Sequence, residues 1–190
     1  MTLIHINPNI SIKQNSETWS LVIKPQISVW QRRLLFIWII CWSVCGIWVM
    51  AQYRTIQNQN EKIFIILYLA FWFYFEWSMV RVYIWKRFGK EKLWIKQGQL
   101  FYHQAKQKSS KIQSWPLESV GLVEAVSFNP NGFNEIISQS FWMKGHPRVQ
   151  LTCPGTLLRF GFQLDVKTTQ AVIKHFNAAQ KARLKTPQNL

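Results

Sequence analysis

Two long apolar runs dominate the pattern of hydrophobic and polar positions. The first, Leu34 to Ala51, has no charged residue among its 18 positions, and the second, Ile63 to Val80, is equally long with one acid, Glu76. A helix needs about 20 mainly apolar residues to span a bilayer. Because aromatic residues flank both runs, the pattern predicts a transmembrane helical hairpin over residues 34–85, with helices at 34–51 and 63–84.

The segment before the hairpin, residues 1–33, contains an internal echo. Ile6-Asn-Pro-Asn-Ile-Ser-Ile-Lys-Gln14 is followed by Ile23-Lys-Pro-Gln-Ile-Ser-Val-Trp-Gln31, and five of the nine positions are identical. Apolar residues alternate in both copies, which is typical of strands, and proline confines such strands to a sheet edge. Two interpretations stay open: edge strands that pair with each other or extend a C-terminal sheet, or coincidence in a biased segment.

After Arg87 the pattern changes to short alternating runs separated by turn residues, which is typical of strands. Leu93 and Ile95, then Leu100 and Tyr102, flank Gln97-Gly98 and predict a hairpin. Further strands are predicted at Ile112 to Leu117, Gly121 to Phe128, Glu135 to Met143, Arg148 to Thr152 and Leu157 to Leu164. The pattern therefore predicts about seven mostly antiparallel strands.

A helix is predicted to close the chain. Asp165 can cap it, because a carboxylate accepts hydrogen bonds from the free N–H groups of a first helical turn. One face of the helix carries Val166, Thr169, Val172, Ile173, Phe176 and Ala179. Helical spacing of apolar residues predicts that this face docks on the sheet. The predicted organisation is thus an α+β soluble domain over residues 88–182, followed by a tail at 183–190.

The positive charge is concentrated at the soluble end. The chain has 23 Lys and Arg against 8 Asp and Glu, a net charge of +15, and 11 of those net charges follow the hairpin. Basic residues flank both outer ends of the hairpin, whereas its connector offers only Arg54 and Lys62. By the positive-inside rule, both termini are predicted to be cytoplasmic in a multi-pass protein of the bacterial inner membrane. Cys153 is the single cysteine of the soluble part, so no disulfide framework is predicted.

Three segments resemble the pleckstrin-homology-like (PH-like) domains that bacteria attach to membrane helices. These are Glu91-x-Leu93-x-Ile95-x-x-Gly98-x-Leu100-x-Tyr102, Trp115-Pro-Leu-Glu-Ser-Val120 and Leu158-Arg-Phe-Gly-Phe-Gln-Leu164. With Ile23-Lys-Pro-Gln-Ile-Ser-Val29, the layout is also similar to an uncharacterised family of proteobacterial two-helix integral membrane proteins with a Pro-Asn-x-Ser element. Gln26 replaces the usual Asn, although Pro8-Asn9-Ile10-Ser11 keeps it. The resemblance implies a PH-like cytoplasmic β domain and no particular activity.

Glu76 is the sharpest chemical candidate, since an ionisable group within a membrane span is costly and by default functional. Its predicted place near the cytoplasmic end favours pairing with Arg81 or Arg33, which would pin the hairpin or an oligomer. A proton or ion relay is the alternative. On helix one, Ser43 and Gly46 share a face where small residues allow close helix approach. Packing against helix two is favoured there over a lipid or cofactor site, and no cofactor is predicted.

Basic residues of the soluble part form the second candidate site. They are Lys106, Lys108 and Lys111 in one segment, and Lys167, Lys174 and Lys181 on the C-terminal helix. Lysines near a negative leaflet bind anionic head groups at about 1 kcal/mol per charge. A solvated surface and a contact with lipid or a protein partner are equally supported at this point.

Enzyme signatures are not found in the sequence. It contains no HExxH, GxSxG, P-loop or glycine-rich dinucleotide motif, and the acids of the soluble part form no pair. No nucleic-acid-binding motif occurs either. The sequence therefore predicts a non-catalytic accessory or scaffold protein that binds a membrane-protein partner or associates with itself, with help from anionic lipid. The alternative is an oligomeric small transporter or channel component built on the hairpin and Glu76.

Overall fold

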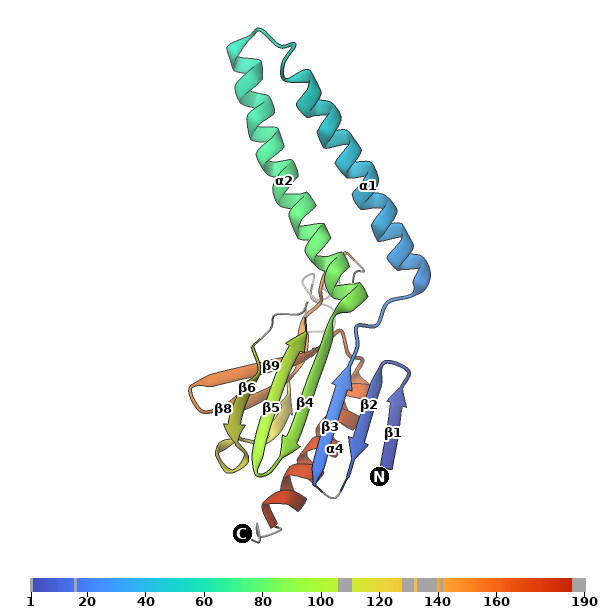
Figure 1. The fold of residues 1–190 in the computed structure, drawn as a ribbon, viewed down its shortest axis with the longest axis vertical. Coiled ribbons are helices and arrows are strands. Elements are labelled where there is room, and N and C mark those ends of the chain that lie inside the picture. Colours follow the sequence, from blue (N-terminus) through green and yellow to red (C-terminus); the bar gives the residue numbers. More distant parts are fainter. Residues whose placement is uncertain are drawn as a thin grey trace. The chain divides into compact units, whose positions relative to one another are not determined.

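A computed structural model describes residues 2–15, 17–105, 111–127, 132, 140 and 142–185 (Figure 1). The chain forms two compact units. One unit combines Met1–Gln26 with Phe88–Leu190, and the other is Ile27–Arg87. Lys106 and Lys108 lie outside the described residues, as does most of the strand predicted at Glu135 to Met143.

The unit Ile27–Arg87 consists of two helices, α1 (Val29–Gln52) and α2 (Gln59–Phe88). Both are long and apolar enough to cross a membrane, with mean hydropathies of 2.3 and 1.8. α1 begins five residues before the apolar run because Ser28 caps it: the Gln31 N–H donates to Ser28 Oγ, and the Ser28 N–H donates to Gln31 Oε1, both at 3.2 Å. Both helices are therefore longer than the apolar runs from which they were predicted, because polar turns extend their ends.

The other unit contains a six-stranded antiparallel sheet in which the strands follow one another in chain order. Its strands are β1 (Thr2–Asn7), β2 (Ile10–Gln14), β3 (Thr18–Ile23), β4 (Lys90–Lys96), β5 (Gln99–Ala105) and β6 (Gln113–Pro116). β3 precedes the two long helices and β4 follows them, yet the two strands pair along their whole length, from Thr18 opposite Lys96 to Ile23 opposite Glu91. The helical pair is therefore an insertion between two neighbouring strands of one sheet.

The N-terminal echo does not form two equivalent strand pairs. Its first copy supplies the end of β1 and all of β2, whereas its second copy places only Ile23 in a strand. The remainder of the second copy leads into Ser28, the cap of α1. The strand interpretation therefore holds for the first copy, and the N-terminal segment joins the C-terminal sheet through β3.

A second, three-stranded antiparallel sheet and a helix complete this unit. The strands are β7 (Val123–Ala125), β8 (Pro147–Cys153) and β9 (Thr156–Phe162), preceded by the short 3-10 helix η1 (Leu117–Ser119) and followed by α4 (Val166–Lys185). Asp165 caps α4 as predicted, since its Oδ2 accepts from the Thr168 N–H at 3.3 Å. The predicted α+β class with antiparallel strands is confirmed, and the Gln97-Gly98 hairpin joins β4 to β5.

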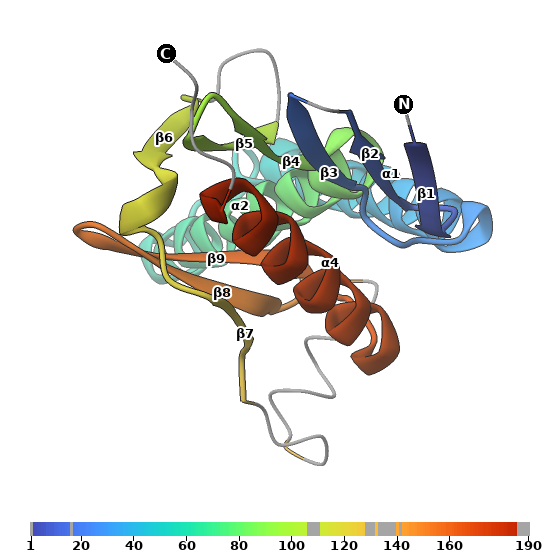
Figure 2. The same ribbon diagram turned by 90° about the horizontal axis from the view of Figure 1, so that it is seen from below.

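The hydrophobic core lies between the six-stranded sheet on one side and α4 with the second sheet on the other (Figures 1 and 2). At its centre, the Trp19 ring of β3 meets the Phe176 ring of α4 edge to face, with centroids 5.4 Å apart. Both side chains are fully buried. Val172 and Ala179 are buried on the same face of α4 as predicted, but Val166 is 56% exposed because it opens the first turn, before the helix reaches the core.

Polar side chains of α4 hold the helix against the backbone around it. Asn177 Oδ1 accepts from the Val123 N–H at 3.0 Å, and Asn177 Nδ2 donates to the Val123 carbonyl at 3.1 Å. Near the C-terminal end, Arg183 Nη1 donates to the Glu17 carbonyl at 2.7 Å. Because Glu17 lies in the turn before β3, this bond also joins the N-terminal strands to the last helix.

Candidate functional site

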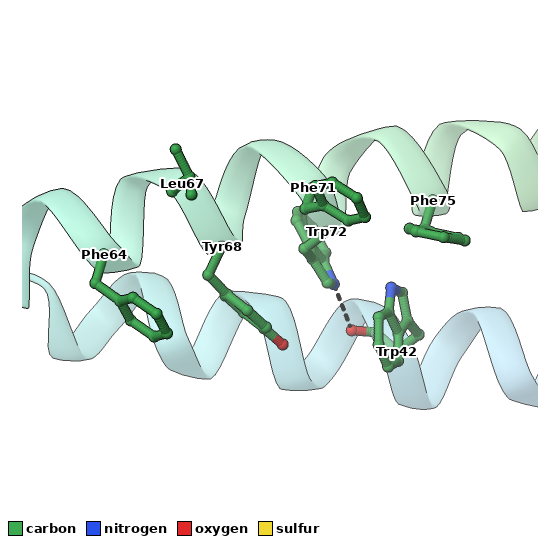
Figure 3. Close-up of a pocket in the computed structure, with 7 residues that line it drawn as sticks. All are labelled: Trp42, Phe64, Leu67, Tyr68, Phe71, Trp72 and Phe75. Carbon is green, nitrogen blue, oxygen red and sulfur yellow. Dashed lines mark hydrogen bonds between the residues drawn. The ribbon is translucent and has the colours of Figure 1, made fainter.

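The two long helices pack closely through a tryptophan and a glycine. The Trp72 indole of α2 lies against Gly46 of α1, where a Cβ would collide with the ring. Trp72 Nε1 donates to the Trp42 carbonyl at 3.0 Å (Figure 3). The close approach predicted for the small-residue face of the first helix is therefore present at Gly46.

Glu76 lies within this helical pair and is bound to Ser43. Ser43 Oγ donates to Glu76 Oε1 at 2.6 Å, whereas the buried Oε2 has no hydrogen-bond partner among the described residues. Ser43 stands at the middle of the first apolar run, so the carboxylate is level with the middle of α1. A carboxylate in an apolar helical pair with one unsatisfied oxygen is energetically costly.

The predicted arginine partners of Glu76 lie further along the helices. At a rise of about 1.5 Å per residue, Arg33 is about 15 Å along α1 from Ser43, and Arg81 is about 7 Å along α2 from Glu76. The Arg81 guanidinium lies over the Trp77 ring, 4.9 Å from its centroid. The structure thus brings Glu76 to Ser43, and neither arginine is among its hydrogen-bond partners in the described part of the chain.

An apolar cavity of about 320 Å³ opens beside the Trp42–Trp72 contact (Figure 3). Its lining residues are Trp42, Phe64, Leu67, Tyr68, Phe71, Trp72 and Phe75. Trp42 Nε1 is buried without a hydrogen-bond partner among the described residues. A cavity with an aromatic and aliphatic lining suits a hydrocarbon chain.

The lysines of α4 form a ridge on its solvent side. Lys167, Lys174 and Lys181 are all exposed, and their seven-residue spacing places them on one line about 10 Å apart. Lys111 is also exposed, just before β6. The predicted basic surface of the helix is present, and we call these three residues the α4 lysine ridge.

Sequence reasoning missed a buried acid that connects the two sheets. Glu91 of β4 is 3% exposed and accepts three hydrogen bonds: from the Gly161 N–H of β9 at 2.7 Å, from Gln104 Nε2 at 3.1 Å and from Tyr102 Oη at 3.2 Å. Burial raises the pKa of the Glu91 carboxyl. Burial and the nearby Glu91 carboxyl also raise the pKa of Tyr102. The alternation of Glu91 with Leu93 and Ile95 was the signal that this acid points inward.

The three cysteines are free thiols in two different settings. Cys41 and Cys45 are exposed on α1, whereas Cys153 of β8 is buried, which raises its pKa to about 11. Within the described ranges, no group of three or more His, Cys, Asp or Glu side chains is placed to hold a metal ion.

No family model and no curated protein matches the chain, so the function is inferred from the fold and the geometry of the candidate sites.

Proposed function

We propose that the protein is a non-catalytic accessory or scaffold protein of the bacterial inner membrane, in which α1 and α2 span the bilayer and a PH-like cytoplasmic domain binds a membrane-protein partner. The observation that carries the proposal is the pairing of β3 with β4 on either side of the helical insertion. An insertion of two apolar helices between β3 and β4 gives that domain a membrane tether at the adjacent ends of the two central strands of its sheet.

The same pairing supports the proposed topology. β3 and β4 are hydrogen-bonded neighbours, so both ends of the helical pair must lie on the same side of any membrane that it crosses. Two spans return the chain to its starting side, which meets this requirement. Arg32 and Arg33 at the start of α1, and Lys90 and Lys92 after α2, favour the cytoplasmic side by the positive-inside rule.

Strand order supports the PH-like description. β3 to β6 are four consecutive antiparallel strands, β7 to β9 are three more, and α4 follows them. The sequence resemblance implied about seven mostly antiparallel strands with one closing helix, all after the helical pair, whereas here β3 joins from before that pair. β1 and β2 extend the first sheet beyond that layout.

We assign partner binding to the α4 lysine ridge. The opposite face of α4 is buried in the core at Val172 and Phe176, so the ridge is the side of the helix that faces outward. Three exposed lysines in line fit an acidic segment of a partner, and electrostatic complementarity of this kind mainly raises association rate and specificity. Lys111, in the segment before β6, is a further exposed basic residue that we include in the proposed partner contact.

Photo-crosslinking in native membranes tests the proposal with the full-length chain. A photoreactive residue at Gln170, which is exposed on α4, should yield a cross-link to a distinct membrane protein, whereas the same residue at Thr156, at the start of β9, should not. The triple variant K167Q/K174Q/K181Q should lower the yield at Gln170 by up to about fivefold per lost charge, since an exposed ion pair contributes up to about 1 kcal/mol. Absence of a cross-link, or cross-links only between copies of this chain, would overturn the scaffold role.

A second candidate function rests on Glu76. Its buried Oε2, which has no hydrogen-bond partner within the described part of the chain, is the arrangement expected of a proton or ion relay in a small oligomeric transporter or channel component. In proteoliposomes, Glu76→Gln should abolish proton or cation flux without changing the oligomer, and Ser43→Ala should reduce it. Unchanged flux, or a loss that follows from disassembly alone, rejects the relay and leaves Glu76 as a helix clamp.

A further inference from the structure

The six-stranded sheet has an outward side that the core does not use, which we call the outer face. The core residues of β2 to β5, α4 and the second sheet all lie on the other side (Figures 1 and 2). Strand register places one row of outward residues across all six strands: Leu3, Lys13, Ser20, Trp94, Phe101 and Ser114. Neighbouring strands lie about 4.8 Å apart, so this row crosses about 24 Å of the domain.

Every charged residue at the outward positions of β1 to β6 is basic. Lys13, Lys90, Lys92 and Lys96 point outward, with Lys92 directly opposite His103. Glu91 is the only acid in these six strands, and it points into the core. The outer face therefore carries a uniform positive charge.

Two stacked aromatic rings occupy the middle of the outer face. Trp94 and Phe101 are cross-strand partners whose ring centroids are 5.3 Å apart with an interplanar angle of 9°. Lys92 Nζ lies 4.9 Å from the centroid of the Trp94 ring. Neither aromatic residue belongs to the hydrophobic core or packs against it, and both are partly exposed on the outer face.

We propose that the outer face docks on the anionic phospholipid head groups of the leaflet to which α1 and α2 tether the domain. The inference rests on the proposed membrane-spanning role of these helices, and it assigns lipid contact to a surface distinct from the α4 lysine ridge. Tryptophan is enriched at the membrane interface, where its ring lies at head-group level beside lysine and arginine. Lys90 and Lys92 follow the end of α2 by two and four residues, so the face begins next to the tether.

The ring geometry favours lipid over single-stranded nucleic acid. Binding of bases on a sheet requires open aromatic faces on which the bases stack. In this sheet, Phe101 already stacks on Trp94, and the Lys92 ammonium lies against the same ring. The stacked pair with its neighbouring lysine is an amphipathic group, which suits insertion among head groups.

Charge sets the expected strength of docking. A lysine near an anionic surface contributes about 1 kcal/mol, so neutralising one should weaken docking about fivefold and neutralising three should weaken it on the order of 100-fold. The Debye length falls to about 3 Å at 1 M salt, so docking should be lost there.

A spin label at Ser20→Cys in the full-length protein tests the proposal. Cys41 and Cys45 are replaced by alanine, and the buried Cys153 is kept. The protein is placed in nanodiscs of phosphatidylcholine with or without phosphatidylglycerol, and relaxation of the label by a nickel chelate on a lipid head group is measured. Relaxation should rise with phosphatidylglycerol and be lost in K13Q/K92Q/K96Q, for which the charge scale predicts docking weaker on the order of 100-fold. The matched variant K167Q/K174Q/K181Q should keep it, and a label at Thr156→Cys should show no rise.

Three results would overturn the proposal. Relaxation could be equal in neutral and anionic discs, or both triple variants could abolish it alike. The label could also be shielded from water and from lipid in every disc, which means that a protein, such as a second copy of this chain, covers the outer face. If the label fails while the Gln170 cross-link persists, lipid docking is refuted and the scaffold role is retained.

Discussion

Trp19→Ala is the most informative perturbation, because Trp19 precedes the helical insertion and Phe176, its partner in the core, follows it. Trp19 is 1% exposed and its ring centroid lies 5.4 Å from that of Phe176. Truncating a fully buried tryptophan to alanine costs about 3–5 kcal/mol. A domain of this kind is stable by about 5–15 kcal/mol, so the loss is a large fraction of the total.

Hydrogen exchange of the full-length protein in nanodiscs measures this loss residue by residue. If both parts of the chain form one cooperative unit, the slowest amides of α4 and β8 should exchange on the order of 100- to 1,000-fold faster in Trp19→Ala, since about 1.4 kcal/mol corresponds to tenfold. Trp94→Ala is the matched control, because Trp94 lies in the same sheet outside the core; it should change these rates by less than about tenfold. Faster exchange confined to β1, β2 and β3, with α4 unchanged, would refute the single-unit interpretation.

Three further predictions follow from buried groups. Burial raises the pKa of Glu91 in the folded protein. The neutral carboxyl therefore contributes to the free energy of unfolding fully below the ordinary pKa of glutamate, and this contribution is lost as the pH rises through the pKa of the folded state. Glu91→Gln should flatten this pH dependence in denaturation curves taken across acidic and neutral pH. Gly46→Ala should destabilise the helical pair by about 1–3 kcal/mol through a clash with Trp72, and adding Trp72→Leu should restore much of the loss in thermal melts. Cys153, with a pKa of about 11 and a buried side chain, should resist alkylation at neutral pH until the domain unfolds, and rapid labelling of the native protein would contradict its placement.

Local pattern predicted most of the secondary structure. The two apolar runs, the Gln97-Gly98 turn and the Asp165 cap each depend on residues near one another in the chain, and each reappears in α1, α2, the β4–β5 hairpin and α4. The observed helix ends differ from the predicted ends because capping residues, such as the reciprocal Ser28–Gln31 pair, lie outside the apolar runs.

Long-range pairing could not be read from the sequence. Nothing local indicates that Ile23 should lie opposite Glu91 across 67 intervening residues, because alternation predicts a strand and not its partner. The same limit applied to Glu76. Its position in the sequence suggested the arginines near the helix end, whereas the packing of Gly46 against Trp72 sets a helix register that brings Ser43 to the carboxylate.

Of the two candidate surfaces, the α4 lysine ridge could be predicted from the sequence because it is periodic, whereas the outer face could not. The α4 lysine ridge repeats every seven residues and was found from spacing alone. The outer face is assembled from strands on both sides of the helical insertion, with Lys13 before it and Trp94 and Phe101 after it. Only the register of the sheet brings these residues into one row.

Cysteine labelling from the two sides of the membrane tests the central claim most directly. With the three native cysteines replaced, single cysteines are placed at Glu17 before β3, at Asn58 in the connector and at Thr156, the first residue of β9, all of which are exposed. A membrane-impermeant maleimide should label Glu17→Cys and Thr156→Cys from the cytoplasmic side only, and Asn58→Cys from the opposite side only. Labelling of all three positions from one side would show that the helices do not span the membrane and would contradict the proposed tether.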